Sequence, residues 1–374
     1  MAADLSSYRG CLWGLAAGDA LGLSVDKKSY EDICRDYGPN GILGYDMVNG
    51  CAEVSSYTQI AAFSCNALLL GITRGNVQNG AIPYHKYMAL GLREWSQTQR
   101  YARFPNKMYC WVCHVEQLRH RKCLDSRTLD TLAREAFGTI SKPVNRNDTP
   151  GALTAAVAAG LFFYPERLKI HEVGLLGAQA VALTHGDPGT FLSGAIVAYT
   201  VAGILNDREL PLREHFSHAA QAVVIQFGKT FPQAQQLQAM VNKVLSLAQS
   251  ERDPHETLMS LQCDTAPRVL AGAMYTCLIC KDDFDTAMVT AVNHSGRSAA
   301  VASLAGAFLG ARLGHKALAP FYLDGLESAA VLDVLARDLV QACPRQVASR
   351  LFDDDWDRKY IQGEPVAQQG WEEA

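Results

Sequence analysis

Apolar residues recur along this chain with the spacing of helices rather than strands. In residues 56–71, Ile60, Phe63, Ala67 and Leu70 share one helical face, and glycine at position 71 is a residue type that often ends helices. We therefore predict a helix over 56–71 that ends at Gly71. The same spacing predicts helices over residues 151–163, 172–184, 190–205, 267–280 and 298–313. Because alternating β-branched runs are few, we expect an all-α fold.

Several of these predicted helices are apolar on nearly all sides, which indicates central positions in a large helical bundle. Their small residues, as in AAVAAG and ASLAGAFLGA, allow helix axes to approach closely. Loops are expected at 37–41, 79–83, 103–107 and 142–151, where glycine, proline and asparagine cluster. We find no internal repeat and no linker. We therefore expect a single domain over residues 1–352 and a polar C-terminal tail over 353–374, which we expect to be partly disordered.

Composition narrows the functional classes. The 374 residues are 48% hydrophobic and 19% charged, which is typical of a globular chain, and the formal net charge of -4 gives no reason to expect nucleic acid as a partner. The N-terminal apolar run is interrupted by Asp19 and fits neither a secretory signal nor a membrane span. Eleven scattered cysteines favour reduced thiols. We expect a cytoplasmic protein without a membrane partner.

Five short segments carry clustered polar side chains, and four of the five also contain glycine. They are GLAAGDALGLSVD at 14–26, VSSYTQIAAF at 54–63, PVNRNDTPGALTAAVAAGLFF at 143–163, THGDP at 184–188 and AVNHSGRSAAVASLAGAFLGA at 291–311. In this order and spacing they resemble the motifs of the ADP-ribosylglycohydrolase family, which includes the dinitrogenase reductase-activating glycohydrolases. The resemblance implies an orthogonal all-α bundle with a cleft for two magnesium ions, and the removal of ADP-ribose from modified side chains or small molecules.

The residues that bind magnesium in the family are largely replaced in this chain. By the resemblance, the vestigial metal positions are Ser55, Ser56, Tyr57, Arg297, Ala299 and Val301. Two aspartates of the family pattern fall on Ser56 and Tyr57, and two more fall on Arg297 and Ala299. Magnesium requires oxygen ligands in octahedral array, and these residues cannot replace four carboxylates. We therefore expect no metal cofactor and identify the chain as a divergent family member and a pseudoenzyme.

The resemblance also assigns a catalytic and a ligand-binding set. The family's glutamate falls on Asp26, a carboxylate one methylene shorter, which is our candidate catalytic residue. The candidate ligand-binding residues are Asn145, Gly151, His185, Asn293, His294, Ser295, Gly296 and Arg297. The family's glycine-rich phosphate loop is altered here, because Asp148 would repel a pyrophosphate and Pro150 lacks an N–H.

Three of these assignments leave alternatives open. Arg297 is either a salt-bridged residue that arrived once the metal was lost, or a cation that binds an anionic ligand in place of the metal. His185 and His294 either line a cleft or are satisfied core residues. We expect a residual cleft that takes ADP-ribose, a nucleotide or a protein partner. The alternatives are an active hydrolase with a reduced or metal-independent site, and a structural or regulatory module with a closed cleft.

A separate cysteine cluster lies in CWVCHVEQLRHRKC at 110–123. Cys110, Cys113 and Cys123 with nearby histidines could bind zinc, although the spacing to a second ligand pair is irregular. A solvated helix surface and ordinary packing are the alternative, and the sequence does not decide between them.

Overall fold

The computed structural model of this chain describes residues 4–78, 82–104, 107–134, 136–163, 168–341, 343 and 353–365. Over these residues the chain forms helices, and two isolated β-bridges are the only strand-like pairs among them. The prediction of an all-α fold is therefore confirmed.

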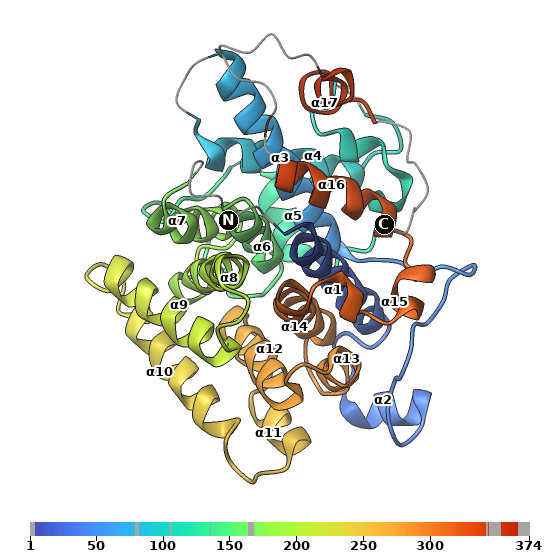
Figure 1. The fold of residues 1–374 in the computed structure, drawn as a ribbon, viewed down its shortest axis with the longest axis vertical. Helices are drawn as coiled ribbons and strands as arrows, with labels where there is room; N and C mark the ends of the chain where they lie inside the picture. Colours follow the sequence, from blue (N-terminus) through green and yellow to red (C-terminus); the bar gives the residue numbers. More distant parts are fainter. Residues whose placement is uncertain are drawn as a thin grey trace.

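The helices follow one another through the chain, with the longest connections between α2 and α3, α4 and α5, and α5 and α6 (Figure 1). The first eight are α1 (Leu5–Leu23), α2 (Tyr30–Tyr37), α3 (Ser56–Gln78), α4 (Tyr84–Thr98), α5 (Ser126–Ala133), α6 (Leu153–Leu161), α7 (Ile170–Ala182) and α8 (Pro188–Asn206). The remainder are α9 (Leu212–Phe227), α10 (Gln233–Leu247), α11 (Pro254–Ser260), α12 (Ala266–Cys280), α13 (Phe284–Val292), α14 (Ser298–Leu313), α15 (Pro320–Asp324), α16 (Ala329–Gln341) and α17 (Asp354–Asp357). Short 3₁₀ turns η1 (Trp111–His114), η2 (Glu116–Leu118) and η3 (His315–Ala317) and a π-turn η4 (Arg358–Gln362) complete the set.

The predicted helices are found close to their expected bounds. The stretch 298–313 matches α14, and 190–205 lies within α8. The prediction that Gly71 ends its helix is wrong, because α3 continues to Gln78. A Cβ added to Gly71 would lie 2.9 Å from the ring of Tyr87, so this glycine makes room for α4. Of the expected loops, residues 79–81 and 105–106 lie outside the described residues.

Helices α1 and α14 lie side by side in the middle of the molecule, with their backbones in direct contact (Figure 1). A Cβ added to Gly10 would lie 2.0 Å from the carbonyl oxygen of Gly310, and one added to Gly14 would lie 2.2 Å from that of Gly306. Contacts this short leave no space for any side chain, so glycine at every fourth position lets the two helices pack at backbone distance.

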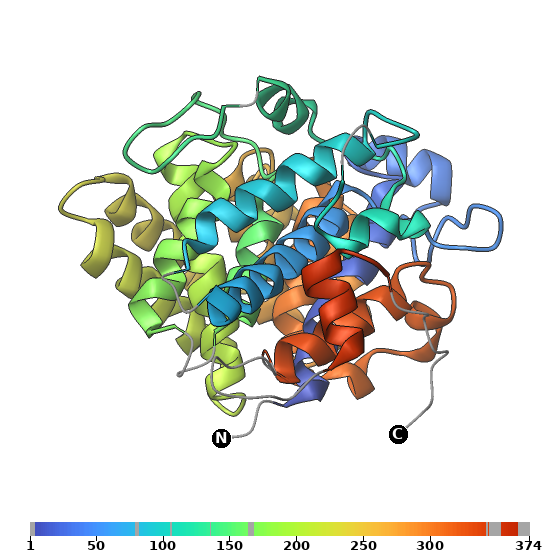
Figure 2. The same ribbon diagram turned by 90° about the horizontal axis from the view of Figure 1, so that it is seen from above.

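Helices α6, α7 and α8 form a second apolar layer beside this pair (Figure 2). Helix α8 is long and apolar enough to cross a membrane by length and composition. Its most apolar window is nevertheless 78% buried inside the protein, as is common for a core helix. Outer helices such as α16 are buried on one face and exposed on the other.

The segment 353–365, part of the expected polar tail, packs against the helical body. Trp356 and Tyr360 are buried, and the Lys359 ammonium lies 2.6 Å from the Asp338 carboxylate of α16. The hydroxyl of Tyr360 donates to the same carboxylate. Aromatic burial and this buried ion pair fix a segment that looks polar in sequence. Residues 366–374 lie outside the described part of the chain.

The contact between α1 and α14 gives the first testable prediction. A Cβ added to Gly306 would lie 2.0 Å from the carbonyl oxygen of Gly14, so Gly306→Val must separate the helices. We expect it to lower the free energy of unfolding by about 3 kcal/mol, at the upper end of overpacking costs. In the control Gly44→Val, the new Cβ meets no atom within 4 Å. Equal stabilities of the two variants in urea unfolding would contradict this packing.

Candidate functional site

The five segments singled out in the sequence meet at one end of the α1–α14 pair. Four direct contacts join them, and each crosses more than thirty residues of sequence. They are Ser55 with Asp19, Ala299 with Asp26, Thr154 with the carbonyl of Tyr57, and Asn145 with the carbonyl of Thr184. The expected convergence is therefore present, and its members can be considered one by one.

Asp19 is a buried carboxylate that ties α1 to the start of α3. Its Oδ2 accepts the backbone N–H groups of Ser55 and Thr58 at 2.9 and 3.0 Å, and the hydroxyls of Ser55 and Thr58 donate to Oδ1 and Oδ2 respectively. Burial raises the pKa of Asp19, and these four hydrogen bonds oppose that shift. Because α3 begins at Ser56, Asp19 acts as an N-cap supplied by another helix. Ser55, one of the vestigial metal positions, donates both its N–H and its hydroxyl to this cap.

Asp26 and Arg297 face each other where α1 ends and α14 begins. Oδ1 of Asp26 accepts the N–H of Ala299 at 3.2 Å, and Oδ2 lies 3.8 Å from a guanidinium nitrogen of Arg297. That nitrogen also donates to the carbonyl of Leu124 at 3.1 Å. The Asp26 side chain is 1% exposed. Burial raises its pKa to about 6, although Arg297 and Lys27 act in the opposite direction.

Tyr57 fills the space beside this pair. Its side chain is 1% exposed, and its hydroxyl has no hydrogen-bond partner in the described structure. Burial raises the pKa of Tyr57 well above its usual value, and the nearby Asp26 carboxylate adds to that rise. The neighbouring Ser56 hydroxyl accepts the N–H of Leu124. At this position a phenol and a hydroxyl therefore stand where carboxylates would be needed for a metal.

These residues do not fit a pair of magnesium ions. The two carboxylates beside the vestigial positions are already engaged, because Asp26 bonds to Ala299 and faces Arg297 while Asp19 bonds to Ser55 and Thr58. Ala299 and Val301 are buried and offer no side-chain oxygen. A guanidinium would also repel a divalent cation, which requires several oxygen ligands.

His185 is a fully buried residue in a polar cluster that the sequence analysis missed. Its Nε2 lies 3.2 Å from Oδ2 of Asp125 and 3.1 Å from the hydroxyl of Thr149, and its Nδ1 lies 2.8 Å from the hydroxyl of Thr184. Burial alone would raise the pKa of Asp125. The hydrogen bond from His185, the charge of His185 and the hydrogen bonds from threonine hydroxyls outweigh burial and hold this pKa below its usual range. A Cβ added to Gly151 would lie 2.2 Å from the Asp125 carboxylate. Gly151 therefore makes room for this cluster.

The two asparagines predicted to bind a ligand have internal partners. Asn145 donates to Thr184 and accepts the N–H of Gly186, which holds the 143–151 loop against the 184–188 turn. Asn293 exchanges two hydrogen bonds with the backbone of Ile42. Their amides fix loops, and the ligand-binding role of these residues stays a prediction.

The remaining members of the 293–297 segment are also placed by local contacts. His294 is fully buried, its Nδ1 lies 3.0 Å from the carbonyl of Ser295, and its Nε2 has no hydrogen-bond partner in the described structure. Burial lowers its pKa, which favours the neutral ring. The hydroxyl of Ser295 accepts the N–H of Tyr30. Gly296 has φ of 136°, a left-handed value that glycine tolerates, and it accepts the N–H of Lys27.

Two carboxylates important to this region were not among the predicted site residues. Asp19 belongs to the quoted segment 14–26, but nothing in the pattern shows that it caps a distant helix. Asp125 precedes α5 as its N-cap and accepts the N–H of Arg127. An aspartate just before a helical stretch is a recognisable N-cap signal, so Asp125 could have been found in that role.

The cysteine segment does not converge on one point. Cys113 Sγ lies 3.6 Å from Glu94, whose carboxylate also accepts the N–H of Cys110, whereas Cys123 donates to the carbonyl of Asp125. Burial raises the pKa of all three thiols. Among the described residues, no group of three or more His, Cys, Asp or Glu side chains is arranged to hold a metal ion.

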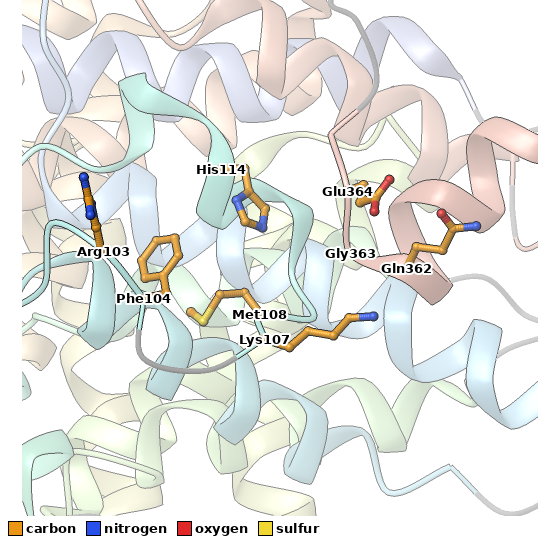
Figure 3. A pocket seen from close by; sticks show the side chains of 8 residues that line it. All are labelled: Arg103, Phe104, Lys107, Met108, His114, Gln362, Gly363 and Glu364. Atoms are coloured by element: carbon orange, nitrogen blue, oxygen red, sulfur yellow. The ribbon is translucent and has the colours of Figure 1, made fainter.

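Three surface cavities lie away from the predicted site. One of about 460 Å³ has Phe104 and His114 on one side and Gln362 and Glu364 on the other (Figure 3). Another, of about 450 Å³, lies between α8 and α9 beside Tyr199 and His215, and a third is lined by α12 and α14 residues such as Arg312. None of these three cavities is lined by a predicted site residue.

Comparisons with known proteins agree with the helical arrangement. The family model described as ADP-ribosylglycohydrolase matches residues 1–348. A solved structure described as "ADP-ribosylglycohydrolase-related protein complex" superimposes with a TM-score of 0.58 and 19% sequence identity, covering 91% of this chain and 98% of that chain. At this identity the likeness shows the fold alone. A search of curated protein sequences gives no significant match.

The raised pKa of Asp26 makes stability depend on pH in a definite direction. The folded protein binds the Asp26 proton more tightly than the unfolded chain, so stability falls as pH rises from about 4 to above 6. Asp26→Asn removes this titration and keeps an acceptor for the Ala299 N–H. As the pH rises from 4 to 7, the free energy of unfolding of the variant should increase by about 2–3 kcal/mol relative to that of the wild type. The measurement is the free energy of urea unfolding of the wild type and of Asp26→Asn as a function of pH. A difference between them that does not change with pH would show that burial does not raise the pKa of Asp26.

Proposed function

Because the chain belongs to the ADP-ribosylglycohydrolase family, we propose that it is a pseudoenzyme whose catalytic position is closed by its own side chains. On this proposal the protein acts by binding a partner and not by hydrolysing an ADP-ribosyl bond. Three features support the proposal: the altered metal positions, the closed contacts around Asp26, and the altered phosphate loop.

The observation that carries the proposal is the placement of Arg297. Its guanidinium donates to the Leu124 carbonyl and lies 3.8 Å from Asp26, the carboxylate that accepts the N–H of Ala299. The Arg297 side chain is 15% exposed. A cation in this position places a positive charge beside the buried Asp26 carboxylate, as a bound metal ion would. Of our two interpretations of Arg297, this geometry supports the internal salt bridge.

The phosphate loop gives independent support. Asp148 makes two contacts outside this loop. Its backbone carbonyl accepts the N–H of Ala266, and its carboxylate lies 3.4 Å from the guanidinium of Arg127. Pro150 has no N–H to offer an anion. A loop with a carboxylate and a proline at these places is poorly suited to approach a pyrophosphate.

One observation favours the alternative of a metal-independent hydrolase. A carboxyl group with a pKa of about 6 is suited to general acid–base catalysis near neutral pH. However, a group that is 1% exposed and bonded to Ala299 has no described path to a substrate. For the alternative of ligand binding, Lys27 and Arg297 both donate to the Leu124 carbonyl, so these two cations lie close together. Saturable binding of ADP-ribose to the wild type in calorimetry would favour that alternative.

Magnesium titration calorimetry tests the proposal. We expect the wild type to give no saturable heat at millimolar magnesium, because four carboxylates are missing. The fourfold variant Ser56→Asp, Tyr57→Asp, Arg297→Asp and Ala299→Asp should bind the ion and unfold at a higher temperature in its presence. The matched control carries asparagine at the same four positions and should do neither.

Two magnesium ions bound by the wild type would contradict the proposal. Circular dichroism of both fourfold variants establishes whether they fold, and the wild-type titration remains decisive if they do not.

A further inference from the structure

The segment between α2 and α3 extends beyond the helical body on the side of α15, as both ribbon views show (Figures 1 and 2). Val48 and Cys51 exchange two backbone hydrogen bonds of 2.8 and 3.0 Å around Asn49 and Gly50. Both central residues have positive φ, 52° and 81°, which is typical of a two-residue type I′ hairpin turn. The tip is therefore a defined hairpin.

Four exposed apolar side chains gather on and beside this hairpin. Leu43, Met47, Val48 and Phe321 are 57%, 46%, 43% and 47% exposed. Phe321 belongs to α15, which contacts the segment where the hydroxyl of Tyr45 donates to the carbonyl of Tyr322. We call these four residues, together with the exposed carboxylates Asp46 and Asp324, the hairpin patch. Apolar residues grouped on a projecting turn are typical of an interaction site.

The base of the hairpin is fixed on both sides. Ile42 bonds to the side chain of Asn293, and the N–H of Ala52 donates to the carbonyl of Gly325 at 2.7 Å. Val54 then donates to the carboxylate of Glu327. A partner that meets the patch would therefore meet a preorganised surface, which lowers the entropy cost of binding.

The main chain leading into the hairpin is unpaired. In the described structure, no intramolecular hydrogen bond involves the backbone N–H groups of residues 43–47. A Cβ added to Gly44 would meet no atom within 4 Å, so the space beside this stretch is open. Exposed, unpaired backbone of this kind can be paired by a strand from another chain.

The charge of the patch indicates the partner's chemistry. Asp46 and Asp324 are exposed, and neither forms an ion pair with a Lys or Arg of the described chain. The nearby cation Lys28 is bonded to Asp36. Apolar side chains flanked by carboxylates favour a partner that presents apolar and basic residues together.

We propose that the hairpin patch is the docking site for an extended segment of a partner protein in which apolar residues alternate with Lys or Arg. The segment lies along residues 43–47 and pairs with their free backbone groups. Its apolar residues contact Met47, Val48 and Phe321, and its cations face Asp46 and Asp324. This docking site does not depend on whether the protein hydrolyses ADP-ribosyl bonds.

Fluorescence anisotropy with a labelled ten-residue peptide of alternating Leu and Lys tests the docking site on the full chain. Met47→Ser with Val48→Ser should weaken the peptide by about ten-fold through lost apolar contact. Asp46→Asn with Asp324→Asn should weaken it by about five-fold and reduce its salt dependence. Ile225→Ser is the matched control, because Ile225 is 75% exposed on α9, and it should leave binding unchanged.

Two further peptides and one measurement on the protein alone complete the test. A Leu–Glu peptide should not bind, and a Leu–Lys peptide with N-methylated alternate amides should bind about ten-fold more weakly if main-chain pairing contributes. Equal binding of the parent and N-methylated peptides, or of the Leu–Lys and Leu–Glu peptides, overturns the proposal. Sedimentation showing a dimer that Met47→Ser with Val48→Ser dissociates would also overturn it, because the occupant would then be a second copy.

Discussion

The backbone contact between α1 and α14 brings Asp26 and Arg297, the centre of the candidate site, together. Gly10 and Gly14 pack against Gly310 and Gly306 at distances that exclude any side chain. The contact continues to the end of α1, where a Cβ added to Gly22 would lie 2.5 Å from the Cα of Ala299. This approach places Asp26 against the first turn of α14, and Asp19, earlier on α1, against the start of α3. The site therefore depends on glycines that contribute no chemistry themselves.

The motif residues retained from the family pattern hold the frame of this protein together. Asp19 and Thr58 join α1 to α3, Asn145 joins two loops, and Asn293 anchors the segment before the hairpin. Each of these polar groups is buried or nearly buried, so its loss would leave an unpaired partner in the core. In this chain those residues have a structural reason to remain. For Ser56, Tyr57 and Arg297, by contrast, the packing requires only side chains that fit the space beside Asp26.

The sequence was informative about helices and much less so about their ends and partners. Apolar periodicity placed α14 correctly, because a helix buried on all sides shows its length directly in its composition. It failed at Gly71, where glycine serves the packing of Tyr87, and it gave no sign that Trp356 would be buried. Local patterns contain no information about which helices meet. The link between His185 and Asp125, sixty residues apart, could therefore not be predicted.

The proposed loss of hydrolysis is tested most directly by turnover of ADP-ribosylated protein side chains, measured for the purified wild type and Asp26→Asn with and without magnesium. The closed site around Arg297 predicts that release of ADP-ribose by the wild type equals that of the variant and does not respond to magnesium. Release by the wild type that disappears in Asp26→Asn would show that this carboxylate reaches a substrate, and the account of a closed pseudoenzyme would then be wrong.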